Sequence, residues 1–166
     1  MDYDKLMIVA HPDDETIFGG AQLIRERGWL VVCVTNGDNK VRRKEFTKVM
    51  SRVNAEFEMW TYKDRWKGDF DRPRLRSELA QVLSRKPVRK IVTHSLQGEY
   101  GHTQHIALSE VVHELSDRDL FVFDRTDRRL DEETLAKKEK LLSYYRSQDI
   151  GWLKKYIRYE GLKQIR

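Results

Sequence analysis

Short apolar runs alternate with longer amphipathic segments along the chain. The apolar runs predict five strands, which span residues 5–10, 29–35, 58–62, 89–94 and 120–124. Segments with apolar residues three and four positions apart predict helices over about 16–27, 41–57, 74–85 and 105–115. The part that begins with "DEETL" is also expected to be helical, because acidic residues suit the first turn of a helix. Strand and helix therefore alternate through most of the sequence.

This alternation predicts an α/β fold. Right-handed crossovers between the strands give a mostly parallel sheet with helices on both faces. We expect the strand order 3-2-1-4-5, in which the first and the fourth strand are neighbours. Functional sites in such open sheets form beyond the carboxyl ends of the strands, at the point where the strand order reverses. The loops that leave these two strands are thus expected to carry the chemistry.

Length and composition narrow the class of protein. The 166 residues, of which 39% are hydrophobic and 36% charged, suit a single globular domain over residues 1–166. No apolar run approaches the ~18 residues of a membrane span, and the first residues lack the features of a signal peptide. Cys33 is the only cysteine and has no partner for an intramolecular disulfide, so we expect a reducing, cytoplasmic setting.

The net charge of +5 raises the question of an anionic partner. Residues 137–166 contain nine basic and three acidic residues, so the excess lies in the helical, basic C-terminal part that begins at about residue 131. This part lacks the basic clusters interleaved with aromatic repeats that are typical of nucleic-acid-binding modules. We interpret it as a solvated helical face and expect no stable nucleic-acid partner.

The two loops at the expected switch point concentrate histidine and carboxylate side chains. They read "HPDDE" from residue 11 and "HSLQGEYGHTQH" from residue 94, and together they contain four of the five histidines. His11 and Asp14 can both turn toward one divalent ion, and the facing loop offers His102 and His105 as further ligands. Two histidines and a carboxylate with one open position are typical of a catalytic zinc site, although they suit other divalent ions too. Asp13 lies beside these ligands and is placed to act as a general base.

Several motifs resemble those of the PIG-L/LmbE-type zinc-dependent N-acetylglucosaminyl deacetylases. They are "AHPDDE" with the glycine pair that follows it, "TNGD", "RRKEF", "GEYGHTQH" and "YRSQ", and they occur in the family's order from Met7 to about Gln148. The resemblance implies a Rossmann-like three-layer sandwich and a Zn2+ cofactor. It also implies hydrolysis of an N-acetyl group from a small-molecule or glycoconjugate substrate of the N-acetylglucosamine type.

The same resemblance implies roles for individual residues. The implied metal ligands are His11, Asp14 and His105. Asp13 would be the base that activates the water on the metal, and His102 would be the acid that protonates the leaving amine. Tyr100 would bind substrate and polarise the acetyl carbonyl, and Arg42 would contact substrate.

Some positions near these motifs depart from the family pattern or allow two interpretations. Gln104 replaces an aspartate that many members carry between the two histidines, and an uncharged side chain there is expected to lower the pKa of His102. Glu15 suits either an exposed helix start or a supporting position behind the ligands. His94 is either a rival ligand or an ordinary residue at a strand end, and Arg42 is either a substrate clamp or a surface charge.

Glycine and tryptophan residues carry two further expectations. Gly19 and Gly20 are expected to let a helix pack closely on the sheet. Trp60 and Trp66 could stack on a sugar ring, although packing in the core or at a rim is the preferred interpretation.

A second class of function stays open from the sequence. A basic binding protein could use the same fold as a platform for nucleic acid or another anionic partner. Salt-sensitive binding of DNA or RNA without zinc would identify such a protein. Assembly into a homo-oligomer is open in either case.

Overall fold

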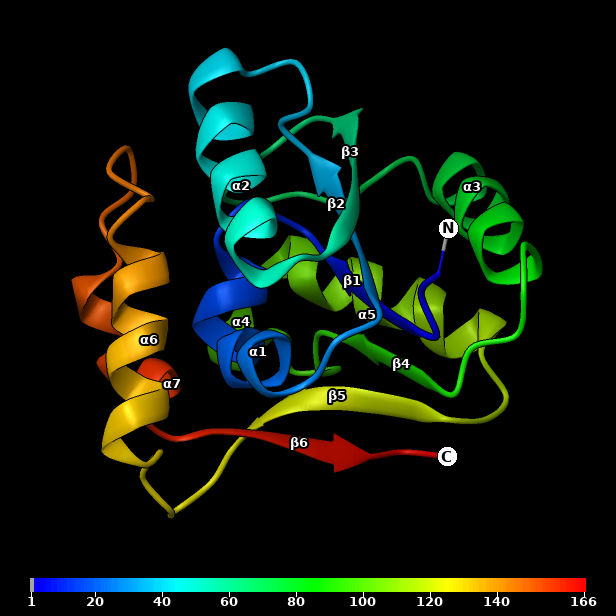
Figure 1. Ribbon diagram of the computed structural model, residues 1–166. Helices are drawn as coiled ribbons and strands as arrows, with labels where there is room; N and C mark the ends of the chain where they lie inside the picture. Colours follow the sequence, from blue (N-terminus) through cyan, green and yellow to red (C-terminus); the bar gives the residue numbers. More distant parts are fainter. Residues whose placement is uncertain (1) are drawn as a thin grey trace.

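Six strands form one sheet in the computed structural model, which describes residues 2–166 (Figure 1). Their order is β3-β2-β1-β4-β5-β6, which confirms the predicted order 3-2-1-4-5 and adds one strand at an edge. The strands that pair in parallel are β1 (Lys5–Val9), β2 (Trp29–Thr35), β3 (Glu56–Tyr62), β4 (Lys90–Thr93) and β5 (Leu120–Arg125). β6 (Glu160–Gln164) pairs antiparallel with β5. The N-terminal and the C-terminal parts of the sequence both contribute strands to this one sheet, and we therefore propose a single domain.

Helices cover both faces of the sheet, as predicted. One face carries α1 (Asp14–Arg25), α2 (Lys40–Val53), α6 (Glu132–Leu142), the 3-10 helix η1 (Gly151–Leu153) and α7 (Lys154–Arg158). The other face carries α3 (Arg72–Ser84) and α5 (Thr103–Leu115), and the short α4 (Gly98–Gly101) leads into α5. Within residues 2–166, none of these helices combines the length and the apolar character that crossing a membrane requires.

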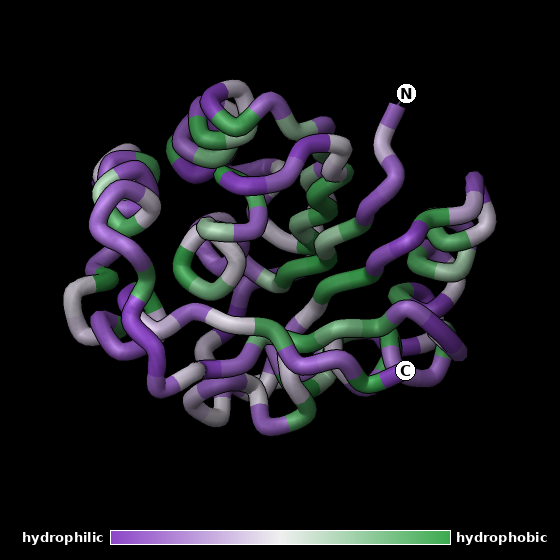
Figure 2. The backbone as a smooth tube through the Cα atoms, turned by 60° about the horizontal axis from the view of Figure 1, so that its bottom comes forward, coloured by the Kyte–Doolittle hydropathy of each residue, from purple (hydrophilic) through white to green (hydrophobic). Residues whose placement is uncertain are grey.

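The central strand β1 shows why the sheet is covered on both sides. Met7 and Val9 belong to the apolar cluster under α1, α2 and α6, whereas Leu6 and Ile8 belong to the cluster under α3 and α5. Strands of a parallel sheet are apolar on both faces because helices bury both of them. The residues of the central strands are accordingly hydrophobic, and those of the outer loops are mostly hydrophilic (Figure 2).

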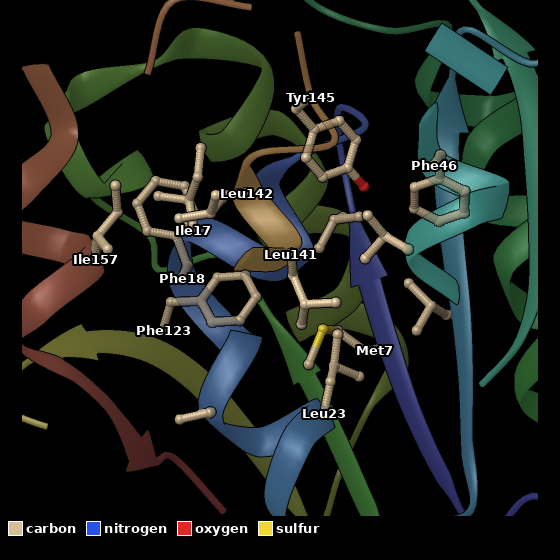
Figure 3. Packing of buried hydrophobic residues seen from close by; sticks show 14 of the residues in the cluster. Met7, Ile17, Phe18, Leu23, Phe46, Phe123, Leu141, Leu142, Tyr145 and Ile157 are labelled. Carbon is tan, nitrogen blue, oxygen red and sulfur yellow. The ribbon is translucent and has the colours of Figure 1, made fainter. Parts of the chain in front are cut away.

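Gly19 permits the close packing of α1 on the sheet, as expected. A Cβ atom at this position would lie 2.8 Å from Met7 Cε and 3.0 Å from Phe123 Cε1. Figure 3 shows these two side chains packed beside α1. Gly20 faces α6 instead, where a Cβ atom would lie 3.0 Å from Lys138 Cγ. The expectation of close helix–sheet packing is therefore right for Gly19 and wrong for Gly20.

Two predicted boundaries are wrong. The helix expected over residues 41–57 ends at Val53, because Asn54 adopts the left-handed conformation (φ 55°) that closes many helices. The C-terminal part, expected to be helical throughout, ends in β6. Strand pairing with the otherwise open edge of β5 satisfies the backbone hydrogen bonds there, and such tertiary pairing overrides local preference.

Candidate active site

The carboxyl ends of β1 and β4 lie side by side, as the predicted strand order requires. Met7 of β1 pairs with Val92 of β4, so the segments that follow the two strands leave the sheet at the same place. The topological switch point of this sheet lies between these strands. The two histidine-containing loops therefore meet there.

Three side-chain atoms from these loops converge. His11 Nδ1 lies 3.2 Å from Asp14 Oδ2, and His105 Nε2 lies 3.1 Å from the same oxygen. The two ring nitrogens are 3.3 Å apart. Ligand atoms bound at zinc's usual distances in a tetrahedral arrangement are ~3.3 Å from one another. All three residues are buried, and their donor atoms are spaced as the ligands of one divalent ion.

Glu99 is a residue of this site that sequence reasoning missed. Its Oε1 contacts the Nδ1 of His105 at 2.9 Å and the Nδ1 of His94 at 2.7 Å, while its Oε2 accepts the Ser95 backbone N–H at 2.7 Å. Its φ of 61° lies in the left-handed region, and such strain is often found at functional sites. A carboxylate behind a ligating histidine fixes the ring and its tautomer. The only signal in the sequence is a glutamate six residues before His105, which nothing distinguishes from a surface residue.

The charges of the site also fit a cation. Burial alone would lower the pKa of His105, but Asp14 and Glu99 raise it to about 10. Burial alone would raise the pKa of Asp14 and of Glu99, yet the surrounding histidines hold the first well below its ordinary value and bring the second to about 2. The buried carboxylates are therefore ionised and need a positive charge. A divalent ion bound at this point would supply it in place of the proton on His105, since ligating histidines must be neutral.

His94 lies close to the donor atoms of Asp14 and His105, but both of its ring nitrogens already have partners. Asp14, His94 and His105 form a second set whose ligand atoms lie within 4.8 Å of one another. His94 Nε2, however, accepts the backbone N–H of Ala10 at 3.0 Å, and its Nδ1 faces Glu99. Of the two interpretations that the sequence left open, these contacts favour the strand-end residue.

His102 occupies the N-cap position of α5. Its Nδ1 accepts the Gln104 backbone N–H at 3.2 Å, which leaves Nε2 for other partners, and its ring stacks on that of His105 at 4.5 Å. Burial, followed by the charges of His105 and His11, lowers the pKa of His102 to about 4. The expected lowering therefore occurs, but it does not involve the Gln104 side chain. That amide contacts His11 Nε2 at 2.7 Å and donates to the Lys63 carbonyl.

Asp13 stands at the start of α1 without capping it. It occupies the N-cap position, but its carboxylate accepts no hydrogen bond from the helix, and its φ of 123° is far from the usual cap geometry. The carboxylate instead lies 3.8 Å from Arg42 Nη2. Burial and the neighbouring Asp14 raise the pKa of Asp13 well above its ordinary value. A buried carboxylate with a raised pKa is suited to take up a proton.

Glu15 supports Asp13 from behind, and the exposed helix start considered from the sequence is wrong. Its side chain is fully buried, and its Oε1 accepts the Asp13 backbone N–H at 3.0 Å. Its Oε2 accepts the hydroxyls of Thr16 at 2.5 Å and Tyr145 at 2.6 Å. Tyr145 belongs to the "YRSQ" motif, so this contact ties the C-terminal part of the chain to the first motif.

A cavity of about 180 Å³ opens beside these groups. The Arg42 side chain is largely buried at its wall, where Nη1 binds Asp64 Oδ2 at 2.8 Å and Nη2 donates to the Pro12 carbonyl at 2.7 Å. Arg42 is therefore not a free surface charge. The predicted site residues that line the cavity are His11, Asp13, Asp14, Arg42, Tyr100 and His102, and His105 lies behind them in contact with His11 and Asp14.

Comparison with other sequences identifies a matching family model and a relative. The family model described as "PIG-L: GlcNAc-PI de-N-acetylase" matches residues 6–116. Uncharacterized protein L374 of Acanthamoeba polyphaga mimivirus is 36% identical over 163 residues, which cover 88% of this chain and 72% of that protein.

Comparison with solved structures shows the same fold at low identity. The conserved protein TT1542 from Thermus thermophilus has a TM-score of 0.76 at 18% identity, covering 98% of this chain and 94% of that one. The N,N'-diacetylchitobiose deacetylase from Pyrococcus horikoshii has a TM-score of 0.73 at 16% identity, covering 99% and 84%. GalB, the 4-carboxy-2-hydroxymuconate hydratase from Pseudomonas putida KT2440, has a TM-score of 0.66 at 19% identity, covering 93% and 82%. The fold thus occurs in proteins named for two different reactions.

Proposed function

The chain belongs to the PIG-L family, and we propose that it is a metal-dependent hydrolase that removes the acetyl group from an N-acetylglucosamine-type sugar or conjugate. One observation carries this proposal. The donor atoms of His11, Asp14 and His105 lie 3.1–3.3 Å apart, and Asp13 lies beside them with a carboxylate that accepts no hydrogen bond from α1. This arrangement supports a hydrolytic metal site with its base in place.

His11, Asp14 and His105 would hold the ion, for which we propose zinc. Glu99 fixes the ring of His105 through Nδ1, and Gln104 fixes the ring of His11 through Nε2, so that the opposite nitrogen of each ring faces Asp14. When bound, the ion would polarise the acetyl carbonyl and acidify the attacking water.

Asp13 and His102 would divide the proton transfers. Asp13 would take the proton from the attacking water. Its carboxylate supports this role because it accepts no hydrogen bond from the helix that follows it. His102 would deliver a proton from Nε2 to the leaving amine nitrogen. The ring has to be an imidazolium for this step, so its pKa must rise from about 4 as negative charge develops beside it, and Nδ1 must then stop accepting the Gln104 N–H. A base and an acid that both act in the reaction predict a bell-shaped dependence of kcat/KM on pH.

Tyr100 and Arg42 would bind and orient the acetylated group. Both line the cavity, and we assign the Tyr100 hydroxyl to the developing negative charge on the acetyl oxygen. Arg42 is held by Asp64 and by the Pro12 carbonyl, which places its guanidinium beside Asp13. A guanidinium that is already held in place loses little further mobility when it positions a substrate.

A basic surface supports a second candidate function, the binding of an anionic partner. Besides the basic C-terminal part predicted from the sequence, a second cluster of basic residues lies along the exposed side of α2. The residues of that cluster are Lys40, Arg43, Lys44, Lys48 and Arg52. Binding of DNA or RNA that weakens steeply with salt and needs no metal would support this candidate. We rank it second because the donor atoms and Asp13 are all in place.

Acetate release tests the proposed function. The substrates are N-acetylglucosamine, its oligomers, and its lipid and thiol conjugates, given to zinc-loaded and to chelator-treated protein. We expect activity only with metal, and a loss of at least about 100-fold in Asp13→Asn. Asp117→Asn, at an exposed position between α5 and β5, is the matched control and should keep full activity. Full activity in the chelator-treated protein, or in Asp13→Asn, would contradict the proposal.

A further inference from the structure

Two exposed tryptophans stand at the mouth of the cavity. Trp66, from the segment after β3, is 66% exposed, and Trp152, from η1, is 55% exposed. Both line the cavity. Each ring makes a T-shaped contact with a site residue, with ring centroids 5.3 Å apart for Trp66 and His102 and 4.9 Å apart for Trp152 and Tyr100. Large apolar side chains that stay exposed beside a pocket are a mark of a binding surface.

The size of the cavity implies that most of the substrate lies outside it. Its volume of about 180 Å³ is below the ~300–1,000 Å³ of pockets that enclose a drug-sized ligand. It can surround the acetamido group and the atoms next to it. The remainder of a saccharide would then rest against the exposed rings at the mouth.

The charges around the mouth indicate what kind of group rests there. The cavity is lined by the carboxylates of Asp13, Asp14, Asp64 and Asp149 and by a single guanidinium, that of Arg42, which already pairs with Asp64. Even with a divalent ion the lining has no positive excess, so it does not favour a phosphate or a carboxylate. Carboxylate oxygens accept hydrogen bonds from hydroxyls. The lining therefore suits a neutral, hydroxylated group.

We propose that Trp66 and Trp152 are specificity-determining residues, which form an open subsite for the neutral pyranose rings of an oligosaccharide substrate. A pyranose presents C–H groups on its faces and hydroxyls at its edge, which matches flat indole rings bordered by carboxylates. The proposal rests on the proposed function, because it concerns the part of the substrate that does not react. It predicts a preference for neutral oligosaccharides over single sugars and over phosphorylated ones.

Steady-state kinetics separate this role from a catalytic or a merely structural one. Trp66→Ala and Trp152→Ala should each raise KM for N,N'-diacetylchitobiose roughly three- to tenfold, with kcat within about twofold of wild type. Trp66→Phe and Trp152→Phe keep an aromatic face and should recover most of the loss. Trp60→Phe is the matched control, since Trp60 contacts Tyr62 away from the cavity and should leave both constants unchanged. An unchanged KM in both alanine variants would overturn the proposal.

Binding measured without turnover tests the charge preference. In zinc-loaded Asp13→Asn, N,N'-diacetylchitobiose should quench tryptophan fluorescence, and the quenching should weaken when Trp66→Ala is added. N-Acetylglucosamine 1-phosphate should bind more weakly than N-acetylglucosamine, and equal or tighter binding would overturn the proposal. If the sugars bind through Trp66 but the wild type releases no acetate, the result supports the subsite and contradicts the proposed reaction. If acetate is released but KM is unmoved in both alanine variants, the reaction stands and the subsite fails.

Discussion

Glu99→Gln is the substitution that most sharply tests how the histidines are held. The Glu99 carboxylate accepts three N–H groups, from His105 Nδ1, His94 Nδ1 and the Ser95 backbone. An amide of the same shape has one oxygen and one NH₂ group. At least one of the three buried donors therefore loses its acceptor, and the negative charge behind His105 disappears.

Two magnitudes follow from this geometry. Loss of a carboxylate behind a ligating histidine typically weakens metal binding 10- to 100-fold, or about 1.4–2.8 kcal/mol. A buried donor left without an acceptor costs about 1–3 kcal/mol of folding free energy. We therefore expect Glu99→Gln to weaken zinc binding by that factor and to lower the unfolding free energy of the metal-free protein by the second amount.

Zinc affinity is measured by competition with a chromophoric chelator, and stability by urea titration of the chelator-treated protein. Glu114→Gln is the matched control, because Glu114 pairs with Arg76 on the exposed side of α5. It should change the zinc affinity by less than twofold and the stability by less than about 0.5 kcal/mol. A folded Glu99→Gln protein that binds zinc as tightly as the wild type would refute the reasoning about Glu99.

Three further substitutions test hydrogen bonds and packing in the fold that supports the site. Tyr145→Phe removes the hydroxyl that donates to buried Glu15 at 2.6 Å, so the unfolding free energy in urea should fall by about 1–3 kcal/mol, and an unchanged midpoint would show that the bond contributes nothing. Gly19→Ala places a methyl group 2.8 Å from Met7 Cε and 3.0 Å from Phe123 Cε1; the flexible end of Met7 can move and alanine gains about 1 kcal/mol as a helix former, so the net loss in the same titration should stay below about 1 kcal/mol, and a loss above about 3 kcal/mol would show that Met7 cannot move. Asp131→Ala removes the N-cap hydrogen bond of α6 and should cost about 1 kcal/mol by thermal denaturation, whereas Asp131→Asn should recover most of it.

The sheet was predictable because its signals are local. Runs such as residues 29–35 are apolar on both faces, which is what a strand covered on both sides requires, and β2 has these bounds. The last strand, β6, could not be predicted in this way. Its residues form a strand because β5 offers an open edge, and this fact lies in the tertiary structure rather than in the segment itself.

The same distinction applies to the site. His11, Asp14 and the pair His102 and His105 could be found because the strand order brings two loops together and imidazoles next to carboxylates are chemically distinctive. The choice of His105 over His102 as the proposed ligand came from the family resemblance. Glu99 could not be found, since its role depends on an unusual backbone conformation that turns its carboxylate back toward two histidines. Glu15 stands out in the sequence as a third consecutive acid, but its burial against Tyr145 depends on a contact across 130 positions of the chain.

The number of zinc ions held per chain tests the central claim most directly. Metal analysis after gel filtration would compare the wild type with His105→Ala and with His102→Ala. We predict one zinc per chain in the wild type and in His102→Ala, and almost none in His105→Ala. A wild type without bound zinc after loading would contradict the account. His11, His102 and His105 also offer ligand atoms that lie within 4.8 Å of one another. Equal loss of zinc from both variants would therefore contradict the account too, because it would point to this alternative set of ligands.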